Sequence, residues 1–94
     1  MLVMKIGFVG CGKMAGALVQ GVLKAGAFTK DAIIGADRYP AAAKILADQC
    51  GVSIAADNRE LAASANVLVL CVKPGQAHDA LTEIRDGAKD KHVI

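Results

Sequence analysis

With 94 residues, the chain is long enough for one small domain and too short for two. Hydrophobic residues make up 54% of it and ten further residues are glycine, which excludes a disordered chain, and its longest uncharged run, 61–72, is shorter than the roughly 20 residues of a membrane-spanning helix. The net charge is only +2, the basic residues are dispersed and aromatic residues make up 3%, so we expect neither a nucleic acid nor a membrane as partner.

The first part of the chain has the pattern of a strand followed by a helix. Residues 4–10 (MKIGFVG) form a short apolar run that ends in glycine, which is typical of a buried strand. Over residues 13–25, apolar side chains recur every four positions and therefore share one face of a helix. Gly26 is expected to end this helix, because glycine readily takes a positive φ.

The same alternation continues to residue 94. We predict strands at 32–37, 52–55, 66–72 and 92–94, and helices from Pro40 to a stop at Gly51, at 58–64 and at 76–87. Strands that are apolar on both faces and separated by helices are typical of a parallel sheet covered on both sides. The predicted fold is therefore α/β, a Rossmann-type parallel sheet with helices on both faces, truncated in its second half because only the opening of a fifth strand is present.

A glycine-rich motif joins the first predicted strand to the first predicted helix. Gly10, Gly12 and Ala15 form the pattern GxGxxA in the place where a dinucleotide-binding fingerprint lies. In that motif the first glycine permits a tight turn, the second lets the backbone approach a pyrophosphate, and the small third residue lets helix and strand pack closely. The N-terminus of the helix then presents free N–H groups to the phosphates. We therefore interpret residues 1–94 as an NAD(P)-binding domain.

Two charged residues end the second predicted strand and bear on the choice of cofactor. Asp37 is placed to accept hydrogen bonds from the adenosine ribose hydroxyls, which favours NAD. Arg38 can pair with a 2′-phosphate, which favours NADP. Asp37 could alternatively cap the helix that Pro40 opens, and Arg38 could be a surface residue. We expect NADP, with NAD as the alternative.

The segment Val72-Lys73-Pro74 ends the fourth predicted strand. Ligands of open α/β sheets lie at the carboxyl ends of the strands, so this segment should border the same crevice as the glycine-rich loop. We expect it to contact the nicotinamide half of the cofactor. The alternative is an exposed lysine followed by a proline that only ends the strand.

The cysteines and histidines indicate no catalytic or metal site. Three cysteines without a CxxC spacing are typical of reduced thiols in a cytoplasmic protein. Cys11 lies at a helix N-terminus, where the pKa of a thiol tends to fall, but no base is near it in the sequence and we interpret it as a small spacer. His78 and His92 stand alone, so we expect neither to be catalytic and no metal to be bound.

Four segments follow one another over nearly the whole chain: KIGFVGCGKMAGAL, IIGADR, ADNRELAASANVLVLCVKP and DKHVI. Taken together, they resemble the N-terminal domain of the pyrroline-5-carboxylate reductase family. The resemblance implies an NAD(P)-dependent oxidoreductase of proline biosynthesis that reduces the C=N bond of 1-pyrroline-5-carboxylate. It also implies a helical C-terminal domain, absent here, that forms a homo-oligomer and holds the imine, so this domain alone should be inactive.

The resemblance also implies roles for individual residues. Gly10, Gly12, Lys13 and Met14 would form the pyrophosphate loop, Asp37 and Arg38 would meet the adenosine ribose or its phosphate, Asn58 would bind near that ribose, and Val72, Lys73 and Pro74 would line the nicotinamide side. One departure is Gly75, which stands where the family often has glutamine or histidine directly after the proline.

Two other functions remain open from the sequence. One is the cofactor domain of a 3-hydroxy acid dehydrogenase of the same superfamily, which shares the GxGxMA motif and a strand ending in VKP. The other is a stand-alone nucleotide-binding module. A half-begun last strand disfavours the second, because its edge would be left unpaired.

Overall fold

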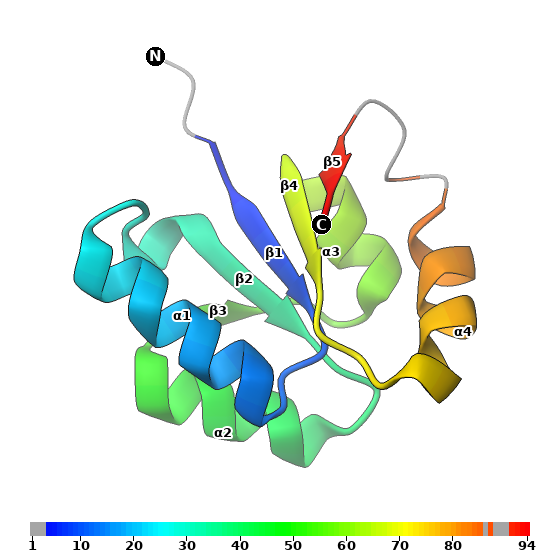
Figure 1. Cartoon of the computed structure of the whole chain (residues 1–94), viewed down its shortest axis with the longest axis horizontal. Coiled ribbons are helices and arrows are strands. Elements are labelled where there is room, and N and C mark those ends of the chain that lie inside the picture. The colour runs from blue at the N-terminus through cyan, green and yellow to red at the C-terminus, as the bar shows by residue number, and fades with distance from the viewer. Residues whose placement is uncertain (1–3, 86, 88–90) are drawn as a thin grey trace.

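A computed structural model describes residues 4–85, 87 and 91–94, and its strands form one parallel sheet of five in the order β3-β2-β1-β4-β5 (Figure 1). The elements are β1 Ile6–Val9, α1 Lys13–Ala25, a 3₁₀ turn Lys30–Ala32, β2 Ile33–Ala36, α2 Pro40–Cys50, β3 Ser53–Ile54, α3 Asn58–Ser64, β4 Val67–Leu70, α4 Pro74–Ile84 and β5 His92–Val93. The predicted α/β class, parallel sheet and alternation of strands and helices are confirmed.

The order of the strands places β1 at the centre of the sheet. Ile6 pairs with Ile33 of β2 on one side and with Val67 of β4 on the other. The chain therefore builds β1, β2 and β3 outward in one direction, and then crosses over β1 to build β4 and β5 in the other. Ligands of such sheets bind where this reversal leaves a crevice, at the carboxyl ends of β1 and β4.

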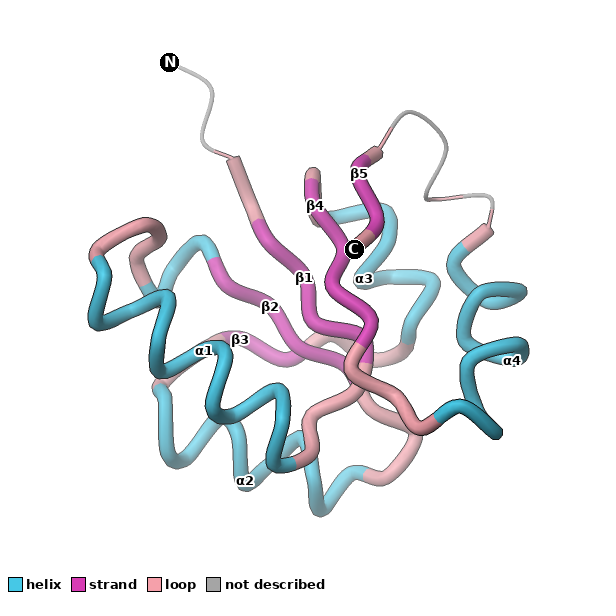
Figure 2. The backbone as a smooth tube through the Cα atoms, viewed as in Figure 1, coloured by secondary structure: helices cyan, strands magenta, loops and turns pink. Residues whose placement is uncertain are grey.

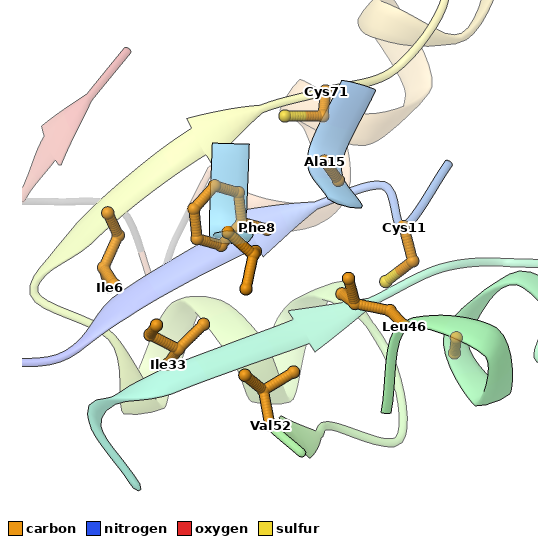
Figure 3. Packing of buried hydrophobic residues seen from close by; sticks show 10 residues of the cluster. Ile6, Phe8, Cys11, Ala15, Ile33, Leu46, Val52 and Cys71 are labelled. Carbon is orange, nitrogen blue, oxygen red and sulfur yellow. The ribbon is translucent and has the colours of Figure 1, made fainter. Parts of the chain in front are cut away.

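Helices cover both faces of the sheet and each face has its own core. One core lies under α1 and α2 and includes Phe8 of β1, Ile33 of β2 and Val52. Figure 3 shows part of it, with the Cys11 side chain against Leu46. The other core lies under α3 and α4 and includes Val9, Leu61, Leu68 and Ile84. Figure 2 shows the strands of the sheet between these two pairs of helices.

The predicted helix ends are confirmed where a local signal marks them. Gly26 and Gly51 follow α1 and α2 with φ of 73° and 71°, the left-handed conformation in which glycine is favoured. Pro40 is the first residue of α2, where its missing N–H costs nothing. At the start of α3, the Asp57 side chain accepts a hydrogen bond of 2.8 Å from the Glu60 N–H.

The fourth helix and the third strand differ from the prediction. The helix begins at Pro74 and not at residue 76, because proline is well suited to the first helical turn. It ends at Ile84, whereas the prediction extended to residue 87. Asp86, within the predicted helix, lies outside the described residues. The strand expected at 52–55 is only Ser53–Ile54. Val52 packs into one core and Ala55 into the other. The apolar residues at both ends of the predicted strand therefore mark buried positions and not residues of the strand.

Candidate functional site

The loops after β1, β2 and β4 converge at one end of the sheet (Figure 2). A cleft of about 420 Å³ lies at these loops. Its walls come from these loops, from the start of α3 and from one face of α4. It is lined by Gly10, Gly12, Asp37, Arg38, Tyr39, Ala42, Asn58, Cys71, Val72, Lys73, Gln76, Asp79, Ala80 and Glu83. Seven of the ten residues predicted to bind cofactor are among them, from segments far apart in the sequence.

The two glycines of the loop serve different purposes. Gly10 has a φ of 100°, and a Cβ built on it would lie 2.7 Å from the backbone oxygen of Cys71, so the fold itself requires glycine there. Gly12 has a φ of −76°, which other residues adopt freely, and a Cβ built on it would meet no atom within 4 Å. The fold does not require Gly12, and its missing side chain leaves room at the wall of the cleft.

The start of α1 leaves backbone donors available at this wall. Gly12 is the N-cap and provides no side-chain hydrogen bond, and the first turn contains no acidic side chain. The N–H groups of a first helical turn have no partner within the helix and carry the positive end of its dipole. An anionic group in the cleft beside Gly12 would therefore be stabilised by the backbone.

Asp37 uses both carboxylate oxygens to hold the loops of the cleft together. Oδ2 accepts a hydrogen bond of 2.7 Å from the Cys11 N–H, and Oδ1 accepts one of 2.8 Å from the Tyr39 N–H. The carboxylate therefore links the glycine-rich loop to the start of α2. A carboxylate has about four acceptor positions, so capacity remains for ligand hydroxyls, and the predicted ribose role of Asp37 stays a prediction.

Arg38 and Tyr39 form the neighbouring part of the wall. Both side chains are exposed, and Tyr39 is 58% accessible although it is aromatic. A guanidinium and a phenol at the mouth of a cleft can bind a phosphate and a flat ring respectively. The sequence analysis missed Tyr39, and the aromatic residue immediately after the strand-end pair Asp37-Arg38 was the available signal.

Asn58, the first residue of α3, lies beside α4 in another wall of the cleft. Its Nδ2 donates a hydrogen bond of 3.5 Å to Oε2 of Glu83, while its Oδ1 is buried without a hydrogen-bond partner among the described residues. Gln76, Asp79 and Glu83 share the face of α4 that lines the cleft, and sequence reasoning missed all three. Their spacing of three and four residues places them on one face of a helix, but did not show that this face looks into the cleft.

Three predicted residues lie outside this cleft. Lys13 lines a separate hollow of about 460 Å³ between α1 and α2, which shares Gly12 and Ala42 with the cleft. Met14 is 54% exposed and lines neither hollow. Pro74 starts α4, while the preceding Val72 and Lys73 do line the cleft.

The environment of Cys11 opposes thiolate formation. Burial raises the pKa of its thiol to about 12, with further contributions from the Asp37 carboxylate and from Cys71. Burial disfavours the charged thiolate, which is the opposite of the lowering expected at a helix N-terminus. This supports the interpretation of Cys11 as a spacer rather than a nucleophile.

Within the part of the chain that the structure describes, no helix is long and apolar enough to cross a membrane. Among the same residues, no group of three or more His, Cys, Asp or Glu side chains could hold a metal ion.

The fold, the glycine-rich loop and the cleft at the strand ends define a dinucleotide-binding domain of the Rossmann type. The chain belongs to the family of NADP oxidoreductases described as coenzyme F420-dependent, whose sequence model matches residues 5–94.

Within that family, the chain is similar to pyrroline-5-carboxylate reductases. It is 37% identical over 90 residues to the pyrroline-5-carboxylate reductase of Methanosarcina acetivorans, covering 96% of this chain and 33% of that protein. The solved structure of the Coxiella burnetii enzyme superposes with a TM-score of 0.80 at 33% identity, covering 90% of this chain and 31% of that one. The structure of Plasmodium falciparum pyrroline carboxylate reductase with NADP bound gives a TM-score of 0.83 at 26% identity, with 99% and 33% covered. The chain thus spans about a third of the length of the curated relatives it matches.

Proposed function

We propose that this chain is the NAD(P)H-binding domain of a pyrroline-5-carboxylate reductase. Such an enzyme reduces the C=N bond of 1-pyrroline-5-carboxylate by hydride transfer and so forms proline. The observation that carries the proposal is the open space at Gly12, beside the uncapped start of α1. The sequence similarity to reductases of this name, over 96% of the chain, supports the particular substrate.

We propose that the residues of the cleft bind a dinucleotide. The backbone at Gly10 and Gly12 would hold the pyrophosphate, Asp37 and Arg38 would meet the adenosine ribose, and Val72 and Lys73 would border the nicotinamide. We propose NADP as the cofactor, with NAD as the alternative. The NADP bound to the Plasmodium falciparum relative and the exposed guanidinium of Arg38 in the cleft support this choice.

The bound cofactor would supply the hydride, and the residues of this chain would bind and orient it. We propose that the imine is held by residues in the two thirds of the relatives' length that this chain does not match. Positioning of two reactants can lower a barrier by about 7–11 kcal/mol, so these 94 residues alone should show no turnover with NADPH and the imine. Multiple turnover by the purified chain would place the substrate site within it.

The other aspects of the proposal concern the whole protein. We propose that it is a homo-oligomer in the cytoplasm, as the resemblance implies. The cytoplasmic location is supported by the three free cysteines, Cys11, Cys50 and Cys71. The names of the curated relatives favour an imine reductase over a 3-hydroxy acid dehydrogenase or a stand-alone nucleotide-binding module.

The test is cofactor binding measured by calorimetry on Gly12→Val and on a matched variant, Gly21→Val. Both glycines have open space where a Cβ would be placed, and Gly21 lies on α1 outside the cleft. Gly12→Val should abolish NADPH and NADH binding, because its side chain would occupy the approach of the pyrophosphate, whereas Gly21→Val should bind as the parent chain does. Equal affinities in all three chains would contradict the proposal.

A further inference from the structure

The contact between Asn58 and Glu83 joins α3 and α4 at one wall of the cleft. Asn58 begins α3 and Glu83 lies in the last turn of α4, 25 positions later. Both residues line the cleft, and a 3.5 Å hydrogen bond runs from Nδ2 of the amide to Oε2 of the carboxylate. At this length the bond contributes little energy by itself, so its effect on orientation matters more.

The chemistry of the carboxylate determines how the amide of Asn58 is turned. An ionised carboxylate has only acceptors, whereas an amide side chain has a donating end and an accepting end. Glu83 can therefore be faced only by the NH₂ group. The carbonyl oxygen Oδ1 must then point away from Glu83, and there it is buried without a donor among the described residues. A buried acceptor without a donor is unfavourable, and a ligand hydroxyl or amino group would satisfy it.

The rest of this wall has the same preference for donors. Asp79 lies one helical turn before Glu83 on the face of α4 that lines the cleft, and its carboxylate also only accepts. The cations that line the cleft, Arg38 and Lys73, come from the loops after β2 and β4. Phosphate oxygens are therefore favoured near those loops and disfavoured beside Asn58.

We infer that Glu83 is a positioning residue, which holds the Asn58 amide so that its carbonyl oxygen accepts a hydrogen bond from a ribose hydroxyl of the bound dinucleotide. The inference rests on the proposed function and adds to it a residue, Glu83, that helps the site recognise the ribose of the dinucleotide. The carboxylate of Glu83 does not touch the reacting atoms; it fixes which end of a neighbouring amide meets the ligand.

A purely electrostatic role for Glu83 predicts the opposite result. A carboxylate near a polyanionic dinucleotide repels it, so its neutralisation should tighten binding. Loss of positioning should weaken binding instead, because a glutamine at this position can face either end of the Asn58 amide. Asp79→Asn is the matched control, since it removes one charge from the same face of α4 and leaves the Glu83 carboxylate, which accepts the hydrogen bond of Asn58, in place.

The experiment measures the Kd of the chain for NADPH and for NADH, with Glu83→Gln and Asp79→Asn each made in the parent chain and in Asn58→Ala. We expect Glu83→Gln to raise the Kd roughly five-fold and Asp79→Asn to lower it slightly. The loss in Glu83→Gln should persist at about 0.5 M salt, where the charge effect of either variant is screened. In the Asn58→Ala background, Glu83→Gln should lose its penalty and behave like Asp79→Asn. Thermal unfolding of the free chains identifies any variant that is merely less stable.

The possible failures are distinct. If Glu83→Gln tightens binding as Asp79→Asn does, or if its effect is the same with and without Asn58, the positioning role is overturned while the proposed function stands. If the parent chain binds neither NADPH nor NADH, the proposed function fails and this inference fails with it. If Glu83→Gln alters folding, the side-chain amide NMR signals of Asn58 are compared in Asp79→Asn and in Glu83→Asp. We expect these signals to shift in Glu83→Asp and to stay as in the parent chain in Asp79→Asn. Signals that are unchanged in both variants would overturn the inference.

Discussion

The carboxylate of Asp37 and the backbone N–H of Cys11 are joined by a hydrogen bond of 2.7 Å. The bond connects the end of β2 to the turn between β1 and α1, 26 positions apart in the sequence. Since the other oxygen of Asp37 accepts from the Tyr39 N–H, this one side chain holds both the glycine-rich loop and the start of α2. Asp37 therefore has a structural role that exists before any ligand binds.

From this contact we predict that Asp37→Asn destabilises the chain. An asparagine has one acceptor oxygen, whereas the N–H groups of Cys11 and Tyr39 each need an acceptor, and the negative charge is also lost. The free energy of unfolding should therefore fall by about 1.5–3 kcal/mol. Urea unfolding followed by circular dichroism measures the change. The control is Asp48→Asn, an exposed residue of α2 outside the cleft. Equal stabilities of the two variants would mean that the Asp37 bonds contribute nothing measurable.

A second prediction concerns stability at alkaline pH. The pKa of Cys11 is raised from its ordinary 9.0 to about 12 in the folded chain, so the folded state keeps this proton to a higher pH than the unfolded state does. The contribution is fully present below pH 9.0 and is lost as the pH rises from 9.0 toward about 12, where the free energy of unfolding should decline. In Cys11→Ala that decline should be shallower, which chemical denaturation at a series of pH values can measure. Parallel curves for the two chains would show that the thiol of Cys11 is not shielded.

The third prediction separates the two glycines of the loop. Gly10→Ala should unfold the chain or lower its melting temperature strongly, because the new methyl group would lie 2.7 Å from the Cys71 oxygen on a backbone with positive φ. Gly12→Ala should leave the melting temperature nearly unchanged and affect only cofactor binding. Differential scanning calorimetry distinguishes them, and a Gly10→Ala chain as stable as the parent would contradict the tight turn described here.

The fourth prediction concerns the choice between NADPH and NADH. If Arg38 binds the 2′-phosphate, Arg38→Ala should lower the preference for NADPH over NADH by roughly 1.5–3 kcal/mol, and high salt should shrink the difference. Lys44→Ala removes the same charge from an exposed part of α2 that does not line the cleft, and should leave the ratio unchanged. Kd values for both cofactors give the ratio. A ratio that is unaffected by Arg38→Ala makes NAD the better choice of cofactor.

The order of the elements and the cleft-lining loops were predictable because their signals are local. Gly26, Gly51 and Pro40 mark helix ends through their own backbone preferences, and Asp57 marks one through a side chain that reaches three residues ahead. The crevice could be predicted as well, because in a parallel sheet the strand ends that carry Gly10, Asp37 and Val72 must meet at one edge.

The wall formed by α4 could not be predicted in the same way. Whether Asp79 and Glu83 face the cleft depends on how α4 packs on β4 and α3, and that is decided by contacts of buried residues such as Ile84 and Leu61. The hydrogen bond between Asn58 and Glu83 depends on the same packing. The link between Asp37 and Cys11 was missed because it depends on the distance between two loops rather than on either sequence segment.

The central position of β1 has a consequence for the order of events during synthesis. Ile6 emerges from the ribosome early, but its partner Val67 on β4 comes 61 positions later. Until then β1 can pair only with β2, and the edge of β1 that will receive β4 remains exposed. The cleft needs both Gly10 and Cys71, so a nascent chain that ends before β4 has no complete cofactor site. Long-range pairing of this kind slows folding, because the loop between the two strands must close before their contacts can form.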